Sequence, residues 1–203
     1  MGENSNPEHR NAARAGLLLF LAGSIILMGI ITAEIFYPPG YSTANSEISD
    51  LGATRPPGSV SYQPSASIFN ATMIIGGLLL IGASIFLYRG LNSRIVPLFS
   101  LLLGTGVLGV GIFPGNNAFL HPLFALCAFI SGGLVQLASV RVAPSPFRFL
   151  FAVLGLTTLI FLFFSPSFIP VLGDGGTERF VAYPVIIWMT GFGGYLIGEA
   201  KRS

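Results

Sequence analysis

Charged side chains are scarce in this chain. Asp, Glu, Lys and Arg together make up 9% of the 203 residues, whereas hydrophobic residues make up 52% and the mean hydropathy is +0.76. Soluble domains usually carry about 25% charged residues. The composition excludes a separate soluble domain and predicts an integral membrane protein.

Cysteine and histidine are nearly absent. Cys127 is the only cysteine, which excludes an intrachain disulfide. Zinc usually takes three or four His, Cys or carboxylate ligands, and His121 is the only histidine expected on the outer side, so we predict no metal site. Calcium and magnesium prefer oxygen ligands, and the carboxylates of Glu47, Asp50 and Asp174 could supply them. The glycines around Asp174 are equally typical of an ordinary turn without a metal ion.

Catalytic and cofactor motifs are also missing. The chain has no nucleophile elbow, phosphate loop or paired-histidine helix, and no basic groove with interleaved aromatic residues. We therefore expect no cofactor and no nucleic-acid partner, and we do not favour an enzyme. The middle of each expected span lacks ionisable groups, which argues against a pump or a coupled carrier.

Six apolar segments are long enough to cross a bilayer. The expected spans cover residues 15–37, 68–88, 95–114, 119–140, 149–168 and 180–198. They form one membrane domain over residues 1–203, with an outer loop at 38–67 and a shorter outer loop at 169–179. The predicted fold is an all-α six-helix transmembrane bundle.

Basic residues are concentrated at four points along the chain. Eight of the ten occur as the pairs Arg10 and Arg14, Arg89 and Arg94, Arg141 and Arg148, and Lys201 and Arg202. Basic residues close to the ends of membrane spans stay in the cytoplasm. Four such points predict three hairpins in the cell membrane, with both the N and the C terminus in the cytoplasm.

The arginines also allow heights along different helices to be compared, because an α-helix rises 1.5 Å per residue. Glu34, Asn70, His121 and Tyr183 each lie 19 or 20 residues from the arginine at the cytoplasmic end of their span. That separation corresponds to about 28 to 30 Å, the thickness of the hydrocarbon core. We therefore expect these four side chains to share one layer at the outer interface.

The expected outer loops place further charges beside this layer. Together with Glu34, the outer side is expected to hold five carboxylates and two arginines. The carboxylates are Glu34, Glu47, Asp50, Asp174 and Glu178, and the arginines are Arg55 and Arg179. Such a group suits a cation, a polar lipid headgroup or internal ion pairs. Because an unpaired charge is costly at this depth, one alternative is that Glu34 simply pairs with Arg55 or Arg179.

Short motifs in the chain carry a resemblance to known families. They run in the order Ile48-Ser49-Asp50-Leu51-Gly52, Pro56-Pro57, Ile68-Phe69-Asn70, Phe113-Pro114, His121-Pro122, Glu178-Arg179 and Tyr183-Pro184. In this order they resemble an uncharacterised family of archaeal and bacterial six-span membrane proteins, a domain of unknown function. More distantly, the first motifs are similar to the eukaryotic Frag/DRAM/Sfk family, whose members are linked to lipid-anchor remodelling, autophagy and phosphoinositide regulation. The resemblance implies a role connected with lipids, and it supplies no catalytic residues.

The leading hypothesis is an outward-facing polar pocket that binds a lipid headgroup or its glycan. Its candidate ligand-binding residues are Glu34, Asp50, Asn70, His121, Glu178, Arg179 and Tyr183. In this hypothesis Arg179 pairs with an anionic phosphate, and His121 or a carboxylate binds hydroxyl groups.

Two other functions stay open. One is a non-enzymatic scaffold whose ion-paired outer loops organise the helices or meet a membrane protein partner. The other is a membrane-embedded lipid hydrolase or transferase that uses His121 and Asp50 as acid and base.

Overall fold

Six α-helices and one short 3-10 helix form the part of the chain that the computed structural model describes, residues 7–200. The helices are α1 (Pro7–Ile35), η1 (Ile48–Leu51), α2 (Ser65–Gly90), α3 (Ile95–Ile112), α4 (Leu120–Ser139), α5 (Phe147–Phe163) and α6 (Ser165–Glu199). No strand occurs within these residues. The all-α class is therefore confirmed.

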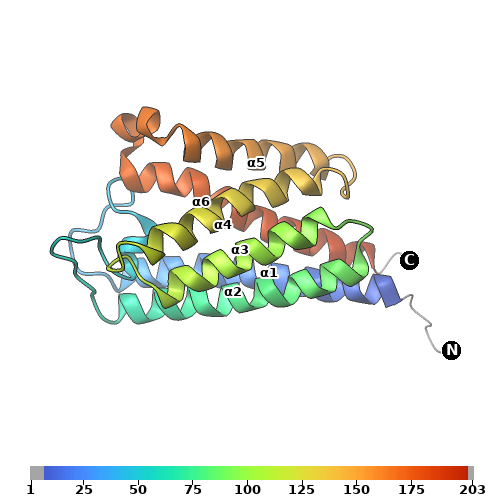
Figure 1. The fold of residues 1–203 in the computed structure, drawn as a ribbon, viewed down its shortest axis with the longest axis horizontal. Coiled ribbons are helices and arrows are strands. Elements are labelled where there is room, and N and C mark those ends of the chain that lie inside the picture. Colours follow the sequence, from blue (N-terminus) through green and yellow to red (C-terminus); the bar gives the residue numbers. More distant parts are fainter. Residues whose placement is uncertain (1–6, 201–203) are drawn as a thin grey trace.

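Successive helices pack side by side in a ring. Each helix from α1 to α5 contacts the next one, and α6 closes the ring against α1, whereas α4 and α6 make only a small contact. Figure 1 shows that neighbouring helices run in opposite directions, and that the two ends of the chain lie at the same end of the bundle. The α2–α3 and α4–α5 links also lie there, and residues 36–64 cover the opposite end, which we call the loop end.

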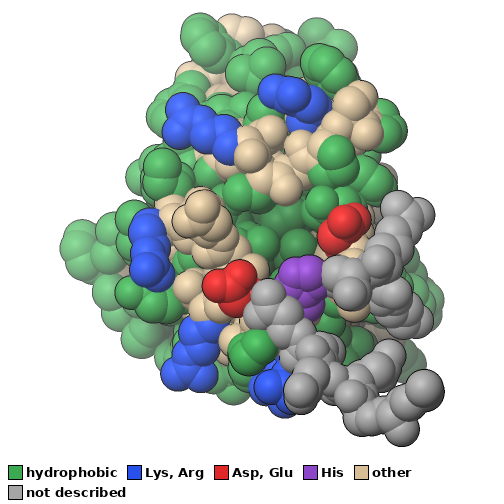
Figure 2. Space-filling view, turned by 90° about the vertical axis from the view of Figure 1, so that its right-hand side faces the viewer, with side chains coloured by type: hydrophobic (Ala, Val, Ile, Leu, Met, Phe, Trp, Pro, Cys, Tyr) green, Lys and Arg blue, Asp and Glu red, His purple; other side chains and the backbone are tan. Residues whose placement is uncertain are grey.

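The end with the termini is the basic end. Figure 2 looks onto it and shows Lys and Arg side chains spread around the face. The sequence places three of the expected basic pairs in this region, at the start of α1 and at the α2–α3 and α4–α5 links. The fourth pair, Lys201 and Arg202, lies outside the described residues. The structure thus gathers the described pairs at one end of the bundle.

Five helices, α1, α2, α3, α4 and α6, are long and apolar enough to cross a membrane. The apolar helix α5 has 17 residues, which gives a length of about 26 Å at 1.5 Å per residue. It ends at Phe163, so the expected span 149–168 is too long at its outer end. Phe164 alone separates α5 from α6, and residues 165–168 form the first turn of α6.

The expected outer loop at 169–179 is not an irregular loop, because the residues on both sides of Gly173 are helical. α6 begins at Ser165 and contains a kink at Gly173, whose φ of 76° and ψ of 170° are not helical. Pro166 fits the first helical turn, where no intrahelical N–H partner is needed. The glycines that resembled a turn therefore redirect a helix, and the helix continues to Glu199.

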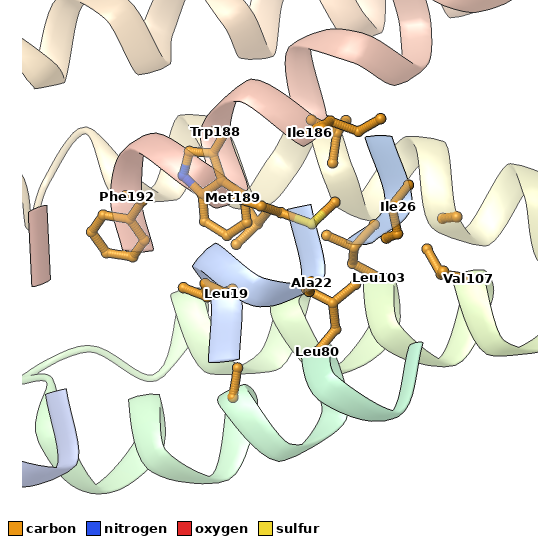
Figure 3. Packing of buried hydrophobic residues seen from close by; sticks show 14 of the residues in the cluster. Leu19, Ala22, Ile26, Leu80, Leu103, Val107, Ile186, Trp188, Met189 and Phe192 are labelled. Atoms are coloured by element: carbon orange, nitrogen blue, oxygen red, sulfur yellow. The ribbon is translucent and has the colours of Figure 1, made fainter. Parts of the chain in front are cut away.

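Tight contacts between helices form the core. Figure 3 shows Leu19, Ala22 and Ile26 of α1 and Met189 and Phe192 of α6 in one buried cluster, where these two helices pack against each other. Glycines permit this approach: a Cβ built on Gly16 would lie 2.6 Å from the carbonyl oxygen of Gly193, and the reverse holds for Gly193. Since lipid tails are as apolar as leucine, close packing of small residues is a main source of helix association in membranes.

Candidate functional site

At the loop end of the bundle, Arg179 on α6 binds both α1 and the segment that follows it. Its Nη2 donates to Glu34 Oε1 at 2.6 Å and to the Tyr41 hydroxyl at 2.7 Å. Its Nη1 donates to the carbonyl oxygens of Thr43 at 2.8 Å and Ser46 at 3.1 Å. The side chain of Arg179 is 10% exposed and that of Glu34 is 21% exposed. This ion pair is therefore largely removed from water.

The charge environment of Tyr41 follows from this arrangement. Burial is the largest effect and raises the pKa of Tyr41, although the Arg179 guanidinium acts in the opposite direction. The phenol therefore stays protonated, accepts from Arg179 and donates to the backbone oxygen of Glu47 at 3.2 Å. Tyr41 thus links the guanidinium to the start of η1.

Two carboxylates hold η1 in place through its backbone. Glu178 on α6 accepts a hydrogen bond from the Ile48 N–H, and Asp50 accepts one from the Glu47 N–H at 2.9 Å. Burial raises the pKa of Asp50, while the hydrogen bond from Glu47 lowers it. The motif that contains Asp50 therefore has a structural explanation, because its carboxylate closes the turn that presents Ile48 to Glu178.

A polar cavity of about 280 Å³ lies between this segment and helices α4, α5 and α6. Its charged or ionisable lining residues are Glu47, Arg55, His121, Asp174 and Glu178, and Ser49, Ser165 and Thr177 add hydroxyl groups. Its apolar wall includes Phe129, Phe161 and Val181. Arg55 pairs with Glu47 at 2.5 Å, and its side chain is 67% exposed.

A second cavity, which we call the apolar cavity, extends into the bundle with a volume of about 80 Å³. It is surrounded by α1, α2, α3, α4 and α6, with η1 at one end. Hydrophobic side chains form nearly all of its wall, and the polar exceptions are Ser49, His121 and Glu178. These three residues also line the polar cavity, so the two cavities adjoin at this point.

His121 is buried at the junction between the cavities. Its Nδ1 lies 2.8 Å from the carbonyl oxygen of Phe113. Because a carbonyl oxygen can only accept, Nδ1 is the nitrogen that carries the proton in this contact, and Nε2 of the neutral ring is then an acceptor. His121 can therefore accept a hydrogen bond from a hydroxyl or ammonium group.

The structure divides the seven expected ligand-binding residues among different places. His121 and Glu178 line both cavities, and Asp50 lies in η1 next to them. Glu34 and Arg179 form the ion pair that was the alternative expectation for Glu34.

Asn70 and Tyr183 are at the same end but line neither of these cavities. The Asn70 amide oxygen is buried without a hydrogen-bond partner beside Gly52, and Tyr183 packs against the hydrophobic core one turn beyond Arg179. The expected single pocket is thus smaller than the set of residues assigned to it.

Sequence reasoning left out several residues that line the polar cavity. Glu47, Arg55 and Asp174 belonged to the expected outer charges, and their charge was the available signal. Phe129, Phe161 and Val181 carry no such signal, because apolar residues occur throughout every span. Among the described residues, no group of three or more His, Cys, Asp or Glu side chains is placed to hold a metal ion.

Comparisons with known proteins place the chain in a family without assigning it a function. A family model described as "Protein of unknown function (DUF998)" matches residues 21–195. No curated protein and no solved structure matches the chain. The likeness to the Frag/DRAM/Sfk family stays a prediction from the short motifs.

Proposed function

The chain belongs to the DUF998 family, whose function is unknown, and we propose from its geometry that its polar cavity binds the headgroup of a membrane lipid. The observation that carries the proposal is the composition of this cavity, which combines ionisable groups with an aromatic and aliphatic wall at one end of the bundle. Ligand pockets typically combine a mainly apolar wall with a few convergent polar groups. A headgroup at a membrane interface presents the matching chemistry.

The proposal includes a topology of six spans in the cell membrane. The gathering of basic residues at the end with the termini supports placing that end in the cytoplasm, and the polar cavity then faces outward. α5 is the shortest span, but its 17 residues reach the lower limit for crossing a bilayer. The three hairpins then rise and return with both termini inside.

Cysteine labelling in intact cells tests this topology. In a Cys127→Ala background, Val60→Cys at the loop end is expected to react completely with a membrane-impermeant maleimide, because Val60 is exposed there. Asn92→Cys, in the exposed link between α2 and α3, is expected to react only after the cells are permeabilised. Labelling of Asn92→Cys in intact cells would contradict the proposed orientation.

The charges in the polar cavity favour one class of headgroup. Three acidic side chains, Glu47, Asp174 and Glu178, accompany one arginine, and Arg55 already pairs with Glu47. Carboxylates accept hydrogen bonds from hydroxyl and ammonium groups but repel phosphate. We therefore propose a headgroup that presents hydroxyl or ammonium groups, including a glycan. Arg179 has protein acceptors at both terminal nitrogens, so its proposed role is to position the segment that covers the cavity.

Retention of lipid by purified variants tests the headgroup proposal. Asp174→Asn is expected to reduce the amount of co-purified lipid about tenfold. A hydrogen bond to a charged group contributes about 1.5 to 3 kcal/mol. The lower end of this range applies because the Asp174 side chain is exposed and salt screens its charge. Extraction followed by mass spectrometry measures the amount and the class of lipid. Arg94→Gln, at the basic end, is the control and is expected to retain lipid normally.

Equal lipid content in Asp174→Asn and Arg94→Gln would remove the polar cavity as the binding site. A retained lipid whose headgroup carries only phosphate, without hydroxyl or ammonium groups, would contradict the proposed chemistry. Both results can be read from the same extracts.

A second candidate function is a non-enzymatic scaffold, and the Arg179 contacts favour it. The Arg179 side chain on α6 binds Glu34 of α1 and two backbone carbonyls of the segment that follows α1. Such contacts hold separate parts of the chain together, as a structural role requires. Both functions predict that changes at Arg179 lower stability, and only the scaffold function predicts that changes at Asp174 leave lipid retention intact. The hydrolase alternative lacks such support, because Asp50 and His121 each already bind the backbone.

A further inference from the structure

The polar and apolar cavities share five lining residues, which are Ser49, Ala125, His121, Phe129 and Glu178. On one side of this junction the wall is charged, and on the other side it is almost wholly hydrocarbon. A ligand that extends across the junction must have a polar end and an apolar end. The order of the two cavities along the bundle is the order of headgroup and tail in a lipid of the adjacent leaflet.

The wall of the apolar cavity extends along the bundle. On α6 its lining runs from Glu178 to Met189, eleven residues apart, which corresponds to about 16 Å along a helix. The volume of about 80 Å³ leaves room along this wall for a single slender apolar group. It is too small for two hydrocarbon chains side by side or for a fused ring system, because a cavity of about 150 Å³ holds only one benzene ring.

We propose that the ligand is an amphiphile with one slender hydrocarbon chain, which passes between His121 and Glu178 into the apolar cavity while its polar end stays in the polar cavity. This inference rests on the proposed headgroup-binding function. Bilayer tails are as apolar as the cavity wall, so the cavity selects by shape and excludes lipids with two chains. The chain supplies van der Waals partners to side chains that face an otherwise unfilled space.

Trp188 provides a built-in reporter for the chain. It is the only tryptophan in the sequence and is fully buried, and its neighbours Ile186 and Met189 line the apolar cavity. Figure 3 shows Trp188 next to Met189 within the buried cluster. Bromine atoms quench indole fluorescence at close range, so a bromine inside the apolar cavity is expected to quench Trp188 more strongly than one on a lipid outside the bundle.

The experiment compares single-chain and two-chain phospholipids that share a hydroxyl- or ammonium-bearing headgroup and carry bromine at the same chain carbons. The full-length protein is held in micelles of unbrominated detergent. The single-chain lipid is expected to cause a saturable loss of most Trp188 emission when the bromines are far from the headgroup. Bromines next to the headgroup are expected to quench little, and the two-chain lipid is expected to quench little in either case.

A pair of variants separates the cavity from the outer surface of α6. Ala182 lines the apolar cavity, so Ala182→Phe is expected to abolish quenching by the single-chain lipid. Ile187 is 50% exposed on the same helix, so Ile187→Phe is the matched control and is expected to leave quenching unchanged. The comparison of bromine positions uses the unmodified protein and does not depend on the folding of either variant.

Native mass spectrometry on the same samples distinguishes the two levels of the proposal. Absence of any adduct with the lipids would overturn the headgroup function itself. An adduct without quenching of Trp188 would leave the headgroup function standing and overturn the insertion of the chain. Equal quenching by the two-chain lipid, or unchanged quenching in Ala182→Phe, would overturn selection by the apolar cavity.

Discussion

Replacement of Arg179 with methionine is expected to lower the free energy of unfolding by about 3 to 5 kcal/mol, the usual cost of removing one partner of a buried ion pair. Methionine keeps much of the length of the side chain but removes the donors to Glu34, Tyr41, Thr43 and Ser46. The Glu34 carboxylate would then be left without its cation in a site that is mostly shielded from water. Chemical unfolding in detergent micelles measures the change.

Arg55 offers a matched control for this prediction. It also pairs with a carboxylate, Glu47, at nearly the same distance, but its side chain is 67% exposed whereas that of Arg179 is 10% exposed. Exposed ion pairs contribute only about 0 to 1 kcal/mol, so Arg55→Met is expected to be nearly neutral. Equal effects of Arg55→Met and Arg179→Met would mean that burial of the Arg179 pair is not what stabilises the loop end.

Lysine is expected to rescue little of the loss at position 179. The guanidinium reaches acceptors on two sides at once, because its donors form a planar fork, whereas an ammonium group is a compact point charge. Glu34→Gln is expected to cost less than Arg179→Met, since it leaves a neutral acceptor near the guanidinium. The double variant should be less destabilising than the sum of the two single changes, because both remove the same interaction.

The height of the polar side chains along the bundle axis was predictable from the sequence. The neighbouring helix that each side chain faces was not. The arginine distances placed Glu34 at the outer interface, and the loop charges placed Arg179 beside that layer. The structure brings these two side chains to within 2.6 Å of each other. Residue spacing fixes height because the helical rise is constant. It contains no information on which neighbour a side chain faces.

Asn70 and Tyr183 illustrate this limit. Both lie at the expected end of the bundle, yet neither lines the two cavities described here. Which side of α2 or α6 faces the interior depends on the order of the helices in the ring, and that order is set by contacts such as α1 against α6. The cavity wall from Phe129 and Phe161 depends on the same order, which explains why a sequence pattern did not indicate it.

Gly173→Ala is expected to destabilise the protein by about 3 kcal/mol or more. The φ of 76° and ψ of 170° at Gly173 belong to a region that is essentially restricted to glycine and costs other residues about 1 to 3 kcal/mol. A Cβ at this position would also lie 2.2 Å from the carbonyl oxygen of Ala44. Since that oxygen accepts a hydrogen bond from the Gly176 N–H at 2.8 Å, the segment cannot withdraw without losing a contact. Unfolding in detergent measures the effect.

Gly58 separates the steric part of this effect from the conformational part. Its φ of 75° is almost the same, but a Cβ built there has no atom within 4 Å. Gly58→Ala is therefore expected to cost about 1 to 2 kcal/mol, the usual penalty of a left-handed conformation. A cost at Gly173 no larger than at Gly58 would show that the close approach of residues 44–46 to α6 is unimportant for stability.

The Gly173 and Arg179 changes are expected to be non-additive when they are combined. Both break the attachment of the same segment to α6, one by forcing Ala44 away and the other by removing the donors to Thr43 and Ser46. Once one change has released the segment, the other has less left to disrupt, so the combined loss should be smaller than the sum. Because this segment also carries Glu47, Ser49 and Arg55 to the polar cavity, the lipid retained by Gly173→Ala should fall together with its stability. Full retention by a destabilised Gly173→Ala protein would mean that lipid is held elsewhere on the molecule.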